Sequence, residues 1–109
     1  MLDRSQTARY NLSEVKELIA LGRVRFCLNR PKNRETLKRL GLDADDALGV
    51  IIKLKQNDFA GVDKEEGKQD ADVYLKTVQA IRVYVKFRVE KPRNLIVISF
   101  HQDEANRGV

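Results

Sequence analysis

The chain has 109 residues, enough for one domain with a hydrophobic core and too few for two. Hydrophobic residues make up 42% of it and charged residues 34%, a balance that excludes an intrinsically disordered chain. The net charge is +5, no apolar run is long enough to span a bilayer, and the N-terminus has no signal-peptide core, so we expect a cytoplasmic protein with no membrane partner.

The single cysteine and the single histidine exclude two kinds of stabilising site. Cys27 excludes an intramolecular disulfide, and one Cys with one His cannot form a structural zinc site. Cys27 lies in the apolar stretch 24–28, which favours a small buried residue over a nucleophile. We therefore expect no metal and no cofactor.

Positive charge gathers in one part of the chain, which contains Arg23, Arg25, Arg30, Lys32, Arg34, Lys38 and Arg39 against the single acid Glu35. Acidic residues gather instead in 43–46 and 58–72. This separation favours a polyanionic partner, since Lys and Arg contacts to phosphate supply most non-specific affinity for nucleic acids. An ordinary solvated charged face explains the charge equally well.

The first half of the chain predicts three helices. Residues 1–9 lack periodicity, and we expect them and residues 102–109 to be flexible. Asn11 is typical of a helix N-cap, with Glu14 completing a capping box, and Gly22 ends this helix.

The stretch Val24–Leu28 is expected to form a short strand or an extended linker. A short helix follows over Arg34–Leu40, and Asp43 caps a third helix. The two helices also fit a DNA-binding helix-turn-helix, although helical hairpins are common. Asn57–Gln69 is expected to be a polar loop.

From Ala71 onward the hydrophobic period changes to two, which predicts strands over 71–76, 81–89 and 95–101. Helices first and antiparallel strands after them predict an α+β domain over residues 1–109. The helices would pack on one face of the C-terminal antiparallel sheet and leave the other face open.

The open face should carry the even positions of the second strand, namely Arg82, Tyr84, Lys86 and Arg88. A four-residue loop at Lys91–Asn94 would place Tyr84 opposite His101 and turn Ile96, Ile98 and Phe100 into the core. Tyr74 and Lys76 of the preceding strand would complete the polar patch.

Such a face suits RNA cleavage without a metal, which needs a base for the 2′-OH, an acid for the leaving 5′-oxygen and cations for the phosphate. Histidine is the side chain best suited to proton transfer near neutral pH, and Lys and Arg supply electrostatic stabilisation. Tyrosine can donate a proton or stack on a base. The alternative is a surface patch with cross-strand Tyr–His packing and no catalytic role.

Three blocks of the chain resemble the motility quorum-sensing regulator (MqsR) family of ribosome-independent mRNA-cleaving toxins. The first block spans 12–25. The second contains Leu-Gly-Leu-Asp at 40–43, Val-Ile-Ile at 50–52 and Asp-Phe at 58–59, and the third contains Asp-Val-Tyr at 72–74, Val-Tyr-Val-Lys at 83–86 and Leu-Ile-Val-Ile-Ser-Phe at 95–100. The resemblance implies a RelE-like fold, mRNA cleavage with a preference for GCU, and neutralisation by a cognate antitoxin in a type II toxin–antitoxin system.

The resemblance also assigns site residues, with departures. The family tyrosine is present as Tyr84, and the family lysine after Ser-Phe is replaced by His101. Ala60-Gly61 replaces a Tyr-Lys pair, which leaves Lys64 as the nearest cation. Asp70-Ala71 replaces Trp-Gln, with Gln69 one step away.

The resulting expectation is an endoribonuclease toxin that acts on mRNA and binds a cognate antitoxin, with a homodimer as an open alternative to a monomer. The expected catalytic residues are Tyr84, His101, Lys86, Lys64 and Gln69. The expected RNA-binding residues are Arg88, Arg82, Lys76, Tyr74, Arg23 and Arg25. Two alternatives stay open: a non-catalytic RNA- or DNA-binding module on a diverged toxin fold, and a chain that serves mainly as an antitoxin-binding surface.

Overall fold

A computed structural model describes residues 2–104. Its helices are α1 (Leu12–Ala20), α2 (Pro31–Leu40), α3 (Ala44–Ile52) and the short 3₁₀ helix η1 (Gln56–Asp58). Its strands are β1 (Leu2–Asp3), β2 (Val24–Phe26), β3 (Phe59–Asp63), β4 (Ala71–Val78), β5 (Ile81–Glu90) and β6 (Asn94–Gln102). They form one sheet in the order β1-β3-β4-β5-β6-β2, antiparallel except where β2 runs parallel to β6.

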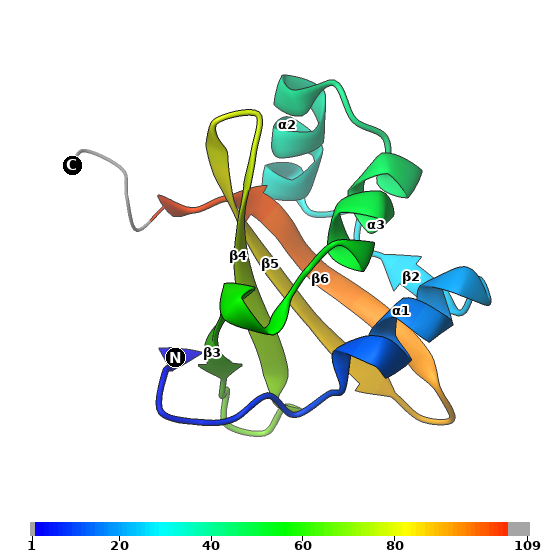
Figure 1. Ribbon diagram of the computed structural model, residues 1–109, viewed down its shortest axis with the longest axis vertical. Helices are drawn as coiled ribbons and strands as arrows, with labels where there is room; N and C mark the ends of the chain where they lie inside the picture. The colour runs from blue at the N-terminus through cyan, green and yellow to red at the C-terminus, as the bar shows by residue number, and fades with distance from the viewer. Residues whose placement is uncertain (1, 105–109) are drawn as a thin grey trace.

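The α+β architecture is as predicted, with helices first and the sheet after them. Figure 1 shows α1 and α3 on the viewer's side of the sheet, while α2 lies along the upper end of β6. The core fills the space between this helical layer and the sheet, and its fully buried members include Val15, Leu18, Ile51, Val85 and Phe87. The opposite face of the sheet is the open face. No helix within residues 2–104 combines the length and apolar character needed to cross a bilayer.

Local signals in the sequence set the ends of the helices. Asn11 caps α1 by accepting a hydrogen bond from the backbone N–H of Ser13, and Asp43 and Asp46 form a capping box at α3. Helix α2 begins at Pro31 rather than at Arg34, because proline at the first helical position lacks only an N–H that has no partner there.

The predicted loop 57–69 is wrong in its first half, which contains the end of η1 and the strand β3. A bulge between Phe59 and Gly61 breaks the alternation of β3, so its five residues do not show the pattern of a strand. Its outer edge pairs with β1. The N-terminal segment is fastened to β4, where Asp72 accepts hydrogen bonds from the backbone N–H groups of Arg9 and Tyr10. Most of the C-terminal segment expected to be flexible, residues 105–109, lies outside the described residues.

The predicted placement of Tyr74 and Lys76 on the open face is wrong. Tyr74 lies opposite Val85 and Lys76 opposite Val83, so both point to the helical side. Tyr74 is fully buried there between the rings of Phe59 and Phe87. Tertiary partners override the polarity pattern of β4, since Asp58 of η1 pairs with Lys76 at 3.7 Å.

The open face of β4 carries small apolar side chains instead. Ala71 and Val73 are 4% and 0% exposed, although they face the side of the sheet opposite the helices of residues 2–104. An ion pair from Lys86 on β5 to Asp63 on β3, 2.9 Å long, crosses β4 at this level. The aliphatic stem of Lys86 covers apolar surface in this way while its ammonium group reaches a carboxylate.

The turn between β5 and β6 also differs from the prediction. Glu90 pairs with Asn94, so the loop has three residues, 91–93, rather than four. A bulge in β6 at Ile98 then restores the predicted register, because Phe87 pairs with Val97 but Lys86 pairs with Ser99. As a result the core receives Leu95, Val97 and Phe100, whereas Ile96 and Ile98 face the open side.

Candidate active site

Tyr84 and His101 lie side by side on the open face, as predicted. They are direct partners in the β5–β6 register, and their rings stack with centroids 5.2 Å apart and planes inclined by 11°. Both side chains are half-buried. The pair therefore combines a proton-transferring imidazole with a phenol at a position that solvent and a ligand can reach.

Helix α2 is bonded to the part of β6 that carries His101. Strand β2 ends at Phe26, which leaves the outer edge of β6 without a strand partner beyond Val97. The buried side chain of Asn33 bonds this edge instead: its amide donates to the carbonyl of Ile98 at 3.0 Å, and its oxygen accepts from the N–H of Phe100 at 2.9 Å. These bonds satisfy backbone groups at the bulge that brings His101 opposite Tyr84.

The contact of the His101 ring with the backbone determines which nitrogen is free. Nδ1 lies 3.0 Å from the carbonyl oxygen of Gln102. A carbonyl oxygen only accepts, so this contact requires the hydrogen on Nδ1. Nε2 of the neutral ring is then left with its lone pair, which is the form that a general base needs.

The hydroxyl of Tyr84 stays protonated across the physiological range. Burial, together with the nearby carboxylates of Asp63 and Asp103, raises its pKa to about 12, and the charge of Arg30 opposes this only in part. Tyr84 is therefore a hydrogen-bond and proton donor rather than a base.

Two cations predicted for the site are already paired with carboxylates. Lys86 donates to Asp63 at 2.9 Å, and Arg88 is bound to Glu90 at 2.7 Å. Burial tends to raise the pKa of Asp63, but the hydrogen bond and charge of Lys86 are among the groups that outweigh it and lower this pKa. Both cations still add positive charge to the face, although their carboxylate partners offset much of it.

Arg30 is a candidate site residue that the sequence did not single out. It precedes α2, and its guanidinium reaches over the edge of β6 to the carbonyl of Ile98 at 3.4 Å. Among the described residues it has no carboxylate partner. Its membership of the basic segment 23–39 was the only signal, and that segment holds six other cations.

A polar cleft of about 300 Å³, which we call the sheet cleft, lies on the open face, and neither Tyr84 nor His101 is among its lining residues. It is lined by Arg30, Asp63, Glu65, Lys68, Gln69, Ala71, Lys86, Arg88 and Ile98. Gln69 thus lies near the predicted cations, yet its amide is engaged by the hydroxyl of Tyr10 and the carbonyl of Val89, each at 2.7 Å.

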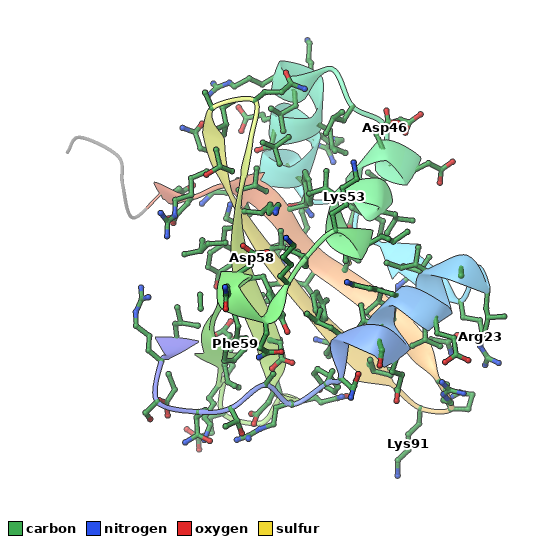
Figure 2. The ribbon with its side chains drawn as sticks, viewed as in Figure 1. Arg23, Asp46, Lys53, Asp58, Phe59 and Lys91 are labelled. Carbon is green, nitrogen blue, oxygen red and sulfur yellow. The ribbon has the colours of Figure 1, made fainter. Side chains whose placement is uncertain are left out.

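Arg82 stands two residues before Tyr84 on the same face of β5 and pairs with Asp103 at 3.6 Å, a carboxylate that also raises the pKa of Tyr84. Arg23 and Arg25 lie farther from the pair. Arg25 points to the open face beside Ile96, whereas Arg23 lies next to the start of β6, at the end of the sheet remote from His101 (Figure 2).

Lys64 follows β3, is exposed, and lies close enough to Asp3 to help lower the pKa of that carboxyl. It does not line the sheet cleft. Asp58 and Phe59, where η1 meets β3, lie on the helical side (Figure 2). Within residues 2–104 no three His, Cys, Asp or Glu side chains are grouped as metal ligands are.

The chain matches the family model described as "Motility quorum-sensing regulator, toxin of MqsA" over residues 7–102. The match takes in every helix, strands β2 to β6, and both Tyr84 and His101. No curated protein matches the chain.

Proposed function

Because this chain belongs to the motility quorum-sensing regulator family of toxins, a family defined with an antitoxin partner, we propose that it is a metal-independent endoribonuclease that cleaves mRNA in the cytoplasm. Family membership supports the toxin role. The observation that carries the enzymatic part of the proposal is the stack of Tyr84 on His101 on the open face of the sheet, with the charge of Arg30 close to Tyr84.

In the proposed reaction Nε2 of His101 removes the proton from the 2′-hydroxyl of the bound nucleotide. The 2′-oxygen attacks the adjacent phosphorus, the bond from phosphorus to the 5′-oxygen breaks, and the hydroxyl of Tyr84 gives its proton to that oxygen. The products are a 2′,3′-cyclic phosphate and a 5′-hydroxyl. The proton then returns from His101 to Tyr84 through solvent, which restores both groups.

Arg30 supplies the main electrostatic stabilisation in this scheme. The charge that builds up on the phosphate oxygens needs a cation whose own charge is not already neutralised. Arg30 meets this condition better than Lys86 or Arg88, both of which hold carboxylates. Lys86 and Arg88 then serve to attract the RNA chain to the sheet cleft, since phosphate contacts account for much of RNA affinity.

Cleavage of RNA in the presence of EDTA tests the proposal. We expect His101→Ala and Tyr84→Phe each to slow cleavage by about 10²–10⁴-fold, the range of general acid–base catalysis. Tyr74→Phe is the matched control, since it removes a hydroxyl from the opposite face of the sheet and leaves the ring packing intact. Cleavage at the wild-type rate by both site variants would show that another part of the chain carries the activity.

A further inference from the structure

A second groove leads away from His101 along helix α2. This α2 groove has a volume of about 230 Å³ and is lined by Lys32, Glu35, Thr36, Arg39, His101, Gln102 and Glu104. The helical residues stand three and four positions apart, so they form one stripe on the helix. His101 belongs to this groove and also stacks on Tyr84, so the groove begins where the reaction is proposed to occur.

The base of the α2 groove is fixed by hydrogen bonds. Thr36 accepts from the backbone N–H of Gln102 at 3.0 Å, and Arg39 donates to the side chain of Gln102 at 2.6 Å. One of the five guanidinium hydrogens of Arg39 is used in this bond, which leaves donors for a ligand. These two bonds connect α2 to Gln102 at the base of the groove.

Lys32, the cation at the other end of the groove from Arg39, can exchange its ion-pair partner. Lys32 pairs with Glu104 at 2.7 Å, but the two side chains are 59% and 40% exposed. Surface pairs of this kind contribute little free energy, so a phosphate can displace the carboxylate from Lys32 at small cost. Glu35 lies between Lys32 and Arg39 on the stripe and has no hydrogen bond or ion pair within the described residues.

We propose that the α2 groove is a subsite for the nucleotide next to the cleaved bond of a single-stranded RNA, an inference that rests on the proposed RNA-cleaving function. Lys32 and Arg39 bind the phosphate of this nucleotide. The carboxylate of Glu35 accepts a hydrogen bond from an amino group of its base, so the subsite disfavours uracil, which has no exocyclic amino group.

Binding of an uncleavable RNA tests the phosphate contacts independently of catalysis. The probe is a fluorescently labelled, single-stranded RNA of mixed sequence with 2′-O-methyl groups throughout, and affinity is measured across a range of salt concentrations. We expect Lys32→Ala with Arg39→Ala to weaken binding about tenfold and to lower the slope of log affinity against log salt by about 0.7 per lost phosphate contact.

Lys38→Ala is the matched control, because Lys38 is an exposed cation of the same helix that does not line the groove. Equal effects of Lys38→Ala and Arg39→Ala would overturn the subsite, as would an unchanged salt slope in the double variant. If the groove variants lose affinity for the probe but the wild-type protein cleaves no RNA, the subsite is retained and the proposed function is rejected. If the wild-type protein cleaves RNA but the groove variants bind the probe as tightly as wild type does, the proposed function is retained and the subsite is rejected.

The role of Glu35 has its own measurement. Glu35→Gln keeps the length of the side chain but replaces a pure acceptor with a group that both donates and accepts. We expect the uncleavable probe to show a change in preference of about fivefold toward uracil at one position of the sequence, determined with probes that differ at single bases. Identical base preferences for wild type and Glu35→Gln would refute this contact.

Discussion

Tyr74 and Tyr84 stand on neighbouring strands but face opposite sides of the sheet. Tyr84 lies on the open face and is half-buried. The hydroxyl of Tyr74 is buried and has no hydrogen-bond partner within the described residues. The same functional group is thus proposed to serve catalysis at one position and costs stability at the other, since a buried hydroxyl without a partner loses its bonds to water.

Replacing Tyr74 by Phe should therefore stabilise the protein. The substitution removes the unpaired hydroxyl and keeps the stacking on Phe87, so we expect a gain of about 1–2 kcal/mol in the free energy of unfolding. Urea denaturation of the variant and the wild type measures the difference. A loss of stability of similar size would show that the hydroxyl has a partner, such as a buried water.

The tyrosines should ionise late in the folded protein. The pKa of Tyr10 is raised by burial, and burial raises the pKa values of Tyr74 and Tyr84 to about 12. The unfolded chain should titrate near the ordinary value of about 10. Because the folded state favours the neutral phenol, this contribution to stability is complete below pH ~10 and is lost as the pH rises toward ~12.

The absorbance of tyrosinate, followed against pH with and without denaturant, measures this shift directly. Folded protein should develop the signal at higher pH than the denatured chain. A midpoint near the ordinary tyrosine value in the folded protein would contradict the burial of these rings.

At the residue scale, the sequence predicted that Tyr84 lies opposite His101, but it did not single out Arg30 as a cation of the site. Alternation along β5 and the length of the following turn were enough to place Tyr84 opposite His101. Two errors cancelled in that prediction, a turn one residue too long and an unforeseen bulge. Arg30 was not singled out because its reach over β6 depends on how α2 docks, which no local pattern encodes.

At the scale of the elements, helix α2 bonds the part of the β6 edge that β2 does not reach. Beyond Val97, the outer edge of β6 is bonded by the side chains of Asn33 and Thr36. Buried polar residues on a helix face that also carries Leu37 and Leu40 are otherwise unfavourable, so these bonds explain their presence. The helix thereby connects the edge of the sheet to the position of His101.

Asn33→Ala should destabilise the protein by about 2–4 kcal/mol. The change leaves the carbonyls of Cys27 and Ile98 and the N–H of Phe100 without this side-chain partner in a buried environment. Asn29→Ala provides the control, since Asn29 is an exposed asparagine in the turn before α2. Urea denaturation compares the two, and equal stability of the two variants would show that the edge of β6 is held by other contacts.

Strands β1 and β3 were not predicted, and β2 was predicted only as a strand or an extended linker, for a shared reason. β1, β2 and β3 have two, three and five residues, too short for an alternating pattern to stand out, and β3 is further interrupted by its bulge. Each of them is formed by pairing with a distant partner in the chain. The long strands β4 to β6 and the three α-helices were predicted because their periodicity or their caps are local.

On the scale of the whole molecule, the helices divide the surface into two sides. The helices bury one face of the sheet and leave the other for a ligand (Figure 1). Along the open face and α2 lie Arg25, Arg30, Lys32, Arg39, Lys86 and Arg88. Carboxylates lie on both sides of the sheet: Asp63 and Glu65 line the sheet cleft, and Asp46 lies at the outer edge of the helical side in Figure 2. In the sheet cleft the four cations Arg30, Lys68, Lys86 and Arg88 outnumber these two carboxylates, which favours approach of a polyanion.

The central claim is that this face cleaves RNA by attack of a 2′-oxygen, and the ends of the cleavage products test it most directly. The substrate is a single-stranded RNA incubated with the protein in EDTA, compared with the same RNA carrying one 2′-deoxy nucleotide at the cleaved position. The account predicts 2′,3′-cyclic phosphate and 5′-hydroxyl ends by mass spectrometry, and no cleavage at the 2′-deoxy position. Products with 5′-phosphate ends, or cleavage at the 2′-deoxy position, would contradict it.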